Sequence, residues 1–175
     1  MPVLRDGPLA LRAWSEDDAP AVHRACQDPE IQRWNPAVPR PYRLEHALAF
    51  VRGEAVPDEL ALAFTVEGAV AGCIGMKPVP DRIGHVGYWC APEHRGRGWT
   101  ARALRLFAAH AFGELGVERL ELVAEPGNAG SLRVAAKAGF VREGVLRAYV
   151  RHPDGRRADA VMHSLLPSDL RASRS

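Results

Sequence analysis

Strand-like and helix-like patterns of hydrophobic residues alternate at the start of the chain. Residues 9–13 predict a short strand, and Ser15, followed by three acidic residues, is typical of a helix start. A hydroxyl there can accept a hydrogen bond from a free backbone N–H group, and acidic side chains favour the positive end of a helix. We expect this helix to continue to about Cys26.

Prolines interrupt the regular pattern in the next segment. Residues 28–42 contain four prolines, which predicts a short helix followed by an irregular surface loop, and such loops often form substrate walls. Residues 44–51 fit a further short helix, and Pro57 is expected to end any regular element that comes before it.

The hydrophobic period changes to two from residue 60. Large and small residues alternate over 60–64, and a turn at 67–68 leads into 70–77, which together indicate an antiparallel hairpin. A third strand is expected at 85–90.

The clearest helical pattern lies between Ala101 and Leu115, where hydrophobic residues recur in steps of three and four. Gly116 is expected to end this helix. The elements expected after it are a strand at 120–124, a helix at 130–138 that Gly139 ends, and two strands at 140–150 and 157–165 around a turn at 153–155.

Length and charge limit the range of architectures and partners. The 175 residues are 47% hydrophobic, enough for one core, so we expect one domain over 1–175 with its core at 8–167 and a flexible tail at 168–175. Lys and Arg number 23 against 21 Asp and Glu, with no long run of one sign, so nothing requires nucleic acid as a partner.

The three cysteines, Cys26, Cys73 and Cys90, lie far apart and form no zinc-type cluster, so no metal is implied. The first residues lack the apolar region of a signal peptide, and no stretch approaches the roughly 18 apolar residues of a spanning helix. We expect a cytoplasmic protein with reduced thiols and no membrane association.

The segment YWCAPEHRGRGWTARAL carries the strongest chemical signal, because a strand end, a glycine-bearing turn and a helix start follow one another. Helix N-termini have free N–H groups, and Gly96 and Gly98 would let a phosphate oxygen approach them. Arg95 and Arg97 add positive charge. Neither the dinucleotide pattern G-x-G-x-x-G nor the nucleotide P-loop is present, so the ligand is another phosphate.

This segment resembles the pyrophosphate motif [QR]-x-x-G-x-[GA] of the GNAT superfamily of N-acyltransferases, through Arg95, Gly98 and the position of Thr100. Thr100 departs from the small residue of the motif. Downstream, EPGNAGSLRVAAKAGF resembles the N-x-x-S-x-x-V-x-x-x-x-G-F segment of the ribosomal-protein N-terminal acetyltransferase branch, and its matching residues are Asn128, Ser131, Val134, Gly139 and Phe140. The order of elements agrees with this branch along almost the whole chain.

The resemblance implies a mixed α/β fold with a central, mostly antiparallel seven-stranded sheet, in which the fourth and fifth strands run parallel and splay apart. Acyl-CoA would lie in that gap. In the family, amides at the end of the fourth strand hold the pantetheine arm and polarise the thioester carbonyl. The residues expected to contact acyl-CoA are Trp89, Cys90, Ala91, Arg95, Gly96, Arg97, Gly98, Trp99, Thr100 and Asn128.

Two residues are candidates for proton transfer. Ser131 occupies the position at which the branch is proposed to place a hydroxyl near the sulfur, although a serine at a helix start can also be only a cap. His85 stands where the branch often carries Glu, two residues before the GYW triplet, and a neutral imidazole can accept a proton. The alternatives for the base are Tyr88, His23, His163 and Asp159, and the residues expected to form the substrate wall are Trp34, Asn35 and Tyr149.

The sequence therefore predicts an N-acyltransferase that binds acyl-CoA and a primary amine together. Acetyl-CoA is the expected donor, with a larger acyl-CoA such as succinyl-CoA as an alternative. The amine could be a protein N-terminus or a small molecule, and the resemblance allows a homodimer. Two other hypotheses stay open: a non-catalytic acyl-CoA binding or sensing module, and an interaction domain with a vestigial pocket.

Overall fold

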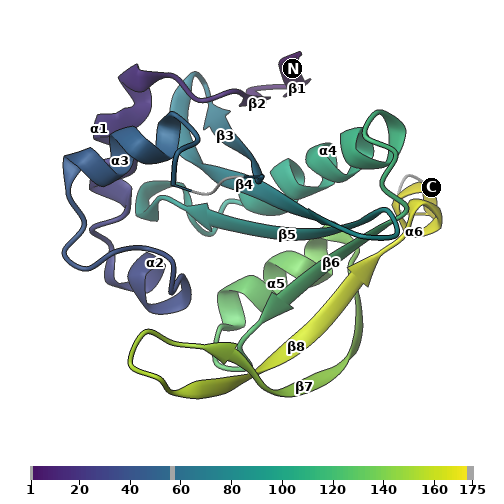
Figure 1. The fold of residues 1–175 in the computed structure, drawn as a ribbon. Helices are drawn as coiled ribbons and strands as arrows, with labels where there is room; N and C mark the ends of the chain where they lie inside the picture. The colour runs from purple at the N-terminus through teal and green to yellow at the C-terminus, as the bar shows by residue number, and fades with distance from the viewer. Residues whose placement is uncertain (1, 56–57, 173–175) are drawn as a thin grey trace.

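The structure is a computed structural model that describes residues 2–55 and 58–172, so the expected break at Pro57 lies outside the described residues. One eight-stranded sheet runs through the molecule in the order β1-β2-β3-β4-β5-β6-β8-β7 (Figure 1). The strands are β1 (Leu4–Asp6), β2 (Leu9–Arg12), β3 (Leu60–Val66), β4 (Ala69–Val79), β5 (Ile83–Cys90), β6 (Arg119–Ala124), β7 (Val141–Arg151) and β8 (Arg157–Leu165).

The sequence predicted seven strands and did not predict β1, which pairs antiparallel with β2 at the edge of the sheet. The turn between these strands contains Gly7 with a φ of 59°, a left-handed conformation that glycine adopts without strain. The strand is only three residues long, too short for its hydrophobic pattern to be recognised.

The mixed α/β architecture is confirmed, and its parallel pair is β5 and β6. These strands pair over three positions only, Ile83 with Arg119, Gly84 with Leu120 and His85 with Glu121. Beyond them β5 remains paired with β4, while β6 remains paired with β8. The two strands consequently diverge toward their carboxyl ends, and Figure 1 shows this divergence opening toward α2.

Over the residues that the structure describes, six α-helices and two 3-10 helices accompany the sheet. They are η1 (Glu16–Asp18), α1 (Ala19–Ala25), α2 (Pro29–Trp34), α3 (Leu44–Val51), η2 (Pro92–His94), α4 (Trp99–Gly113), α5 (Ala129–Ala138) and α6 (Pro167–Ala172). The expected helix start at Ser15 is confirmed by a capping box with Asp18. The expected tail from residue 168 is helical as α6, which contacts α4, and residues 173–175 lie outside the described residues.

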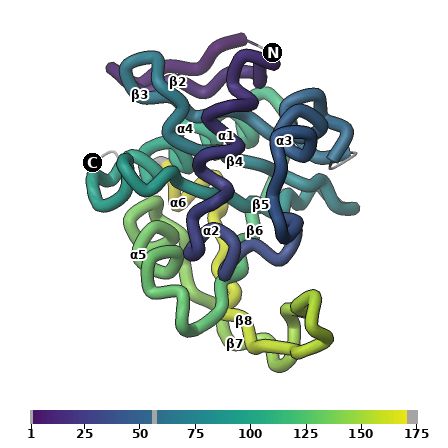
Figure 2. The backbone as a smooth tube through the Cα atoms, turned by 90° about the vertical axis from the view of Figure 1, so that its left-hand side faces the viewer, coloured from purple at the N-terminus to yellow at the C-terminus, as the bar shows by residue number. Residues whose placement is uncertain are grey.

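The helices pack against the two faces of the sheet and produce two hydrophobic cores (Figures 1 and 2). One core joins α4 and α5 to the face that carries Ile74, Val86 and Leu122. The other joins α1 and α3 to the opposite face, which carries Cys73 and Trp89. Side chains alternate between the faces along β5, so Tyr88 packs toward the first core and Trp89 toward the second.

Within residues 2–55 and 58–172, no helix combines the length and the hydropathy that would be needed to cross a membrane. The same residues contain no group of three or more His, Cys, Asp or Glu side chains arranged to hold a metal ion.

Candidate active site

A cavity of about 1200 Å³ opens where β5 and β6 diverge. One side of its lining comes from the starts of α4 and α5, and the other comes from α2, α3 and the loop between them. The carboxyl ends of β5 and β6 form its middle. Figure 2 shows α1, α2 and α3 on the side of the molecule toward which the strands open.

The start of α4 is shaped to bind an anion. Its N-cap is Gly98, with a φ of 80° and no side-chain hydrogen bond to the first turn, and Gly96 has a φ of 75°. Both glycines line the cavity, and no heavy atom lies within 4 Å of where a Cβ would stand on either. Free amides and open space at a helix N-terminus fit the diphosphate of coenzyme A.

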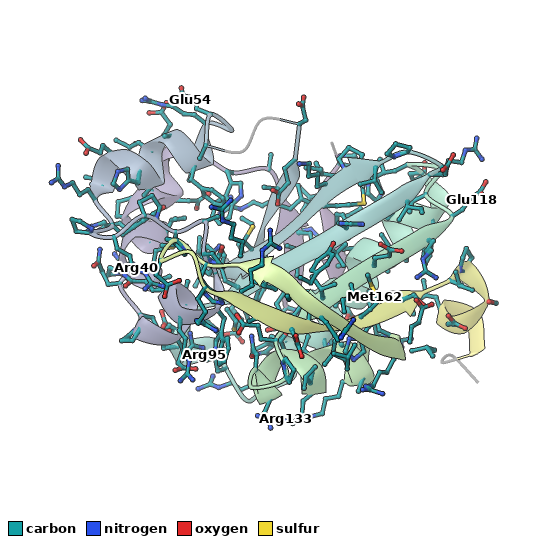
Figure 3. All side chains as sticks on the ribbon, turned by 60° about the horizontal axis from the view of Figure 1, so that its bottom comes forward. Arg40, Glu54, Arg95, Glu118, Arg133 and Met162 are labelled. Carbon is teal, nitrogen blue, oxygen red and sulfur yellow. The ribbon has the colours of Figure 1, made fainter. Side chains whose placement is uncertain are left out.

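The positive charge beside this helix differs from the sequence expectation. Arg95 lines the cavity, but its guanidinium donates to Asp28 Oδ1 at 2.5 Å and to the carbonyl oxygen of Cys90 at 3.1 Å. Arg97 is exposed and is not among the described lining residues. Arg133 and Lys137, one turn apart on α5, line the cavity instead, and Figure 3 shows Arg95 and Arg133 on the same side of the molecule.

Arg133 and Lys137 were missed by the sequence analysis, although the second motif contains them at a spacing of four. That spacing places two side chains on the same face of a helix. Because the motif residue Ser131 also lines the cavity, the basic pair in the same helix could have been recognised as part of the site.

Of the three residues expected near the thioester, Trp89 and Cys90 line the cavity. Ala91 is buried behind them, and its N–H donates to the carbonyl oxygen of Ala71 at 2.9 Å, so this amide is already paired. Burial raises the pKa of the Cys90 thiol, and the neighbouring Thr100 side chain opposes that rise. Cys90 is therefore a protonated thiol, and not a thiolate nucleophile, at neutral pH.

Tyr88 and Ser131 meet inside the cavity. The Tyr88 hydroxyl lies 2.7 Å from Ser131 Oγ and donates to the Ser131 carbonyl oxygen at 3.2 Å. Burial raises the pKa of Tyr88 to about 12, so the phenol stays protonated at neutral pH. The cap of α5 is Asn128, whose Oδ1 accepts from the Ser131 N–H at 3.0 Å. The Ser131 hydroxyl is consequently not the helix cap.

His85 lies outside the cavity. Its Nε2 is 2.8 Å from Glu121 Oε2 in the paired part of β5 and β6, and Arg119 binds the same carboxylate. His85 is not among the described residues that line the cavity, so this geometry does not support it as the base. Of the alternatives, Tyr88 lines the cavity, whereas His23, His163 and Asp159 are absent from its described lining.

Two of the three residues expected to form the substrate wall are among the residues that line the cavity. Trp34 and Asn35 line the cavity, and the Trp34 ring lies 3.3 Å from where a Cβ would stand on Gly127, so α2 reaches across to the loop before α5. Tyr149 is 45% exposed and is not among the described lining residues. Strand β7, which contains Tyr149, is irregular between Leu146 and Val150, and Val150 lines the cavity in place of Tyr149.

Among the described residues, three carboxylates line the cavity, and none of them was a candidate on sequence grounds. Glu30 accepts from Trp34 Nε1 at 2.9 Å, and Glu125 lies 2.8 Å from Nε2 of the buried His152. Glu59, which directly precedes β3, lies above Gly75 of β4. Their positions in the sequence did not suggest a shared site, because Glu30 lies on α2, Glu59 precedes β3 and Glu125 follows β6, and these segments converge only in the fold.

Comparison with known proteins gives a consistent result. The family model "Acetyltransferase (GNAT) domain" matches residues 9–141. YoaA, an uncharacterized N-acetyltransferase of Bacillus subtilis, is 25% identical over an alignment of 173 positions that covers 94% of this chain and 97% of YoaA. The "Putative ribosomal N-acetyltransferase YdaF" of the same organism is 33% identical over 102 residues, 57% of this chain and 55% of YdaF.

A solved structure supports the same fold. RimL, described as a ribosomal L7/L12 alpha-N-protein acetyltransferase in complex with coenzyme A, superposes with a TM-score of 0.80 at 18% identity. The match covers 94% of this chain and 98% of RimL.

Proposed function

Since the chain belongs to the GNAT family of N-acetyltransferases, we propose that it transfers the acetyl group of acetyl-CoA directly to a primary amine while both substrates occupy the cavity. One observation carries this proposal: a single cavity extends from the start of α4 to the wall made by α2 and α3. Direct transfer requires donor and acceptor to be held together, and a shared chamber supplies that proximity.

The donor side of the cavity would hold coenzyme A. The free amides at the start of α4 and the open space at Gly96 and Gly98 fit its diphosphate, and Arg133 and Lys137 add positive charge. When bound, acetyl-CoA supplies an acetyl group that is activated as a thioester. Divergence of β5 and β6 leaves room between the strands for the pantetheine arm.

Ser131 would stabilise the departing sulfur. Its hydroxyl lines the cavity and is free of the capping role that Asn128 performs, while Tyr88 holds it at 2.7 Å. A hydroxyl in this position can donate to a sulfur on which negative charge develops.

The acceptor would enter on the side of α2 and α3. An N-terminal α-amine of a protein is our preferred acceptor. RimL is described as a ribosomal L7/L12 alpha-N-protein acetyltransferase, and YdaF as a putative ribosomal N-acetyltransferase. Aromatic side chains in this half, Trp34, Tyr42 and Phe50, suit an acceptor with an apolar body next to its amine.

A non-catalytic acyl-CoA binding module is the rival. The observation in its favour concerns the two candidate bases on β5: His85 pairs with Glu121 outside the cavity, and burial raises the pKa of Tyr88 to about 12, which keeps the phenol protonated at neutral pH. Calorimetry with acetyl-CoA, combined with an assay for free coenzyme A thiol in the presence of amines and N-terminal peptides, separates the two. Binding with turnover supports the enzyme, whereas binding without turnover for every amine supports the module.

A further inference from the structure

The proposed transfer needs a proton acceptor on the acceptor side, because most amines are protonated at neutral pH and only the neutral form attacks a thioester. Tyr88 lies on the face of the sheet that packs toward α4 and α5, and Ser131, on α5, lies beside it at 2.7 Å. A proton acceptor for the amine should instead lie on the face that packs toward α1 and α3, where the cavity has its other wall.

Glu59 is placed on that face. A Cβ on Gly75 would collide with Glu59 Oε1, so the absence of a side chain at Gly75 makes room for the carboxylate. Gly75 lies between Cys73 and Lys77 on β4, and Cys73 belongs to the core beneath α1 and α3. Side chains two residues apart in a strand share a face, so the carboxylate stands on the α1 and α3 side.

The strand next to Gly75 leaves open space beside this carboxylate. Gly75 is paired with Gly87 of β5, both line the cavity, and no atom lies within 4 Å of where a Cβ would stand on Gly87. Gly87 precedes Trp89 and Cys90, the residues of β5 that we expect near the thioester. An amine above Gly87 would thus have Glu59 on one side and the end of β5 on the other.

The surroundings of Glu59 keep its carboxylate available. Among the described residues, no hydrogen bond or ion pair is formed by the Glu59 side chain, whereas Glu30 accepts a hydrogen bond from Trp34 and Glu125 lies 2.8 Å from His152 Nε2. Burial raises the pKa of Glu59, and the charge of Lys77 opposes that rise. Cys73, the other titratable neighbour, is a neutral thiol because burial raises its pKa as well.

We propose that Glu59 is the catalytic residue that binds the acceptor ammonium and removes its proton, an assignment that rests on the proposed acetyl transfer. One N–H proton passes to the Glu59 carboxylate, and the freed lone pair of nitrogen forms the C–N bond. The C–S bond breaks, its electron pair stays on sulfur, and the sulfur is protonated from Ser131. The nitrogen loses a second proton, which restores Ser131 through solvent, and Glu59 releases its proton to water.

Replacement of Glu59 by glutamine tests this role. In Glu59→Gln, kcat/KM should fall by about 10²-fold or more while the acetyl-CoA affinity measured by calorimetry stays at the parental value. Affinity for the amine alone, measured without acetyl-CoA, should also weaken because the charge is lost. The parental rate should fall as pH is lowered through the pKa of Glu59, and the variant should lose this acidic limb.

The matched control is Glu67→Gln, the same change at an exposed turn between β3 and β4 that does not line the described cavity, and it should keep the parental rate and pH profile. Gly75→Ala is a second variant, because its methyl group would displace the carboxylate without removing it. It should also lower turnover, and it keeps the proposal testable if Glu59→Gln does not fold.

The outcomes separate the two proposals. Suppose that the parent is active and that Glu59→Gln keeps its rate, amine affinity and pH profile. This result would overturn the assignment of Glu59 and leave the acetyl transfer intact. If Glu59→Gln does not fold, the same result in Gly75→Ala would have the same meaning. A parent that binds acetyl-CoA but acetylates no amine overturns both.

Discussion

The hydroxyl oxygen of Tyr88 lies 2.7 Å from Oγ of Ser131, inside the cavity between the diverging strands. These residues are 43 positions apart in the sequence and come from β5 and from the first turn of α5. Their hydrogen bond links the strand end expected near the thioester to the helix expected beside the sulfur. It holds the Ser131 hydroxyl inside the cavity, where we propose that it acts on the leaving group.

Loss of that hydroxyl should affect chemistry more than stability. In Ser131→Ala we expect kcat and kcat/KM to fall together by about 10²-fold, with acetyl-CoA affinity retained, because the hydroxyl acts only as charge develops on sulfur. Turnover, calorimetry and the melting temperature should be measured on the same sample. Parental turnover in a folded Ser131→Ala protein would remove Ser131 from the mechanism.

The contrasting variant is Asn128→Ala, which removes the side-chain cap of α5. A lost cap costs about 1 kcal/mol, which corresponds to a fall in melting temperature of about 2–4 °C in a chain of this size. If Ser131→Ala lowered the melting temperature as much as Asn128→Ala does, the hydroxyl would have a structural role that the hydrogen bonds do not indicate.

Coenzyme A binding should depend on the open space at Gly98. In Gly98→Glu a charged side chain would enter the region expected to hold the diphosphate, so acetyl-CoA affinity should fall severely. Because Gly98 has a positive φ, any side chain there also adds strain. Gly68→Glu provides the matched control, since Gly68 has a φ of 84° in open space but does not line the described cavity. Equal acetyl-CoA affinity in the two variants would place the diphosphate elsewhere.

Substitution of His85 tests whether the residue that the sequence pattern predicts as the base accepts the proton. The imidazole pairs with Glu121 outside the cavity, so His85→Gln should retain near-parental turnover between pH 6 and pH 9. A steady-state pH profile of the variant checks this. A large loss of kcat without loss of acetyl-CoA affinity would restore His85 as the proton acceptor.

The ion pairs at the closed end of the parallel strands predict a pH dependence of stability. Hydrogen bonds from Arg119 and Ser164 lower the pKa of Glu143 to about 2 in the folded protein, below its ordinary value of 4.5. A lowered folded-state pKa stabilises the protein above the unfolded-state value, and this contribution is lost as pH falls toward 2.

Melting temperatures of the parent and Glu143→Gln should accordingly differ at pH 7 and converge as pH falls from about 5 toward 2. The difference should be small, because Glu143 is 41% exposed and solvent weakens exposed ion pairs. A difference that stays constant over this range would mean that the charge of Glu143 does not stabilise the fold.

Local patterns predicted most of the elements because each depends on neighbours in the sequence. The alternation at 60–64, the three- and four-residue steps after Ala101 and the glycine at 139 correspond to β3, α4 and the end of α5. The start of α4 was predictable for the same reason, because the glycine turn and the helix are adjacent in the sequence. Strand β1 was not predictable, because three residues are too few to show a hydrophobic period.

The acceptor half of the site depends on distant residues, and the sequence patterns did not reveal it. Glu59 and Gly75 meet only because β3 and β4 pair, and Trp34 reaches Gly127 across the gap between β5 and β6. Tyr149 is exposed and Val150 lines the cavity, because β7 is irregular between Leu146 and Val150 and strand alternation there no longer predicts which residue faces the cavity. A motif cannot report such contacts, since no segment contains both partners.

The most direct test of the account follows acetyl transfer itself. The purified chain is mixed with acetyl-CoA and a panel of small amines and N-terminal peptides, and release of coenzyme A thiol is measured together with the mass of the product. The account predicts amine-dependent thiol release and a product that carries one acetyl group on its amine. Tight binding of acetyl-CoA without thiol release for every amine and peptide would contradict it.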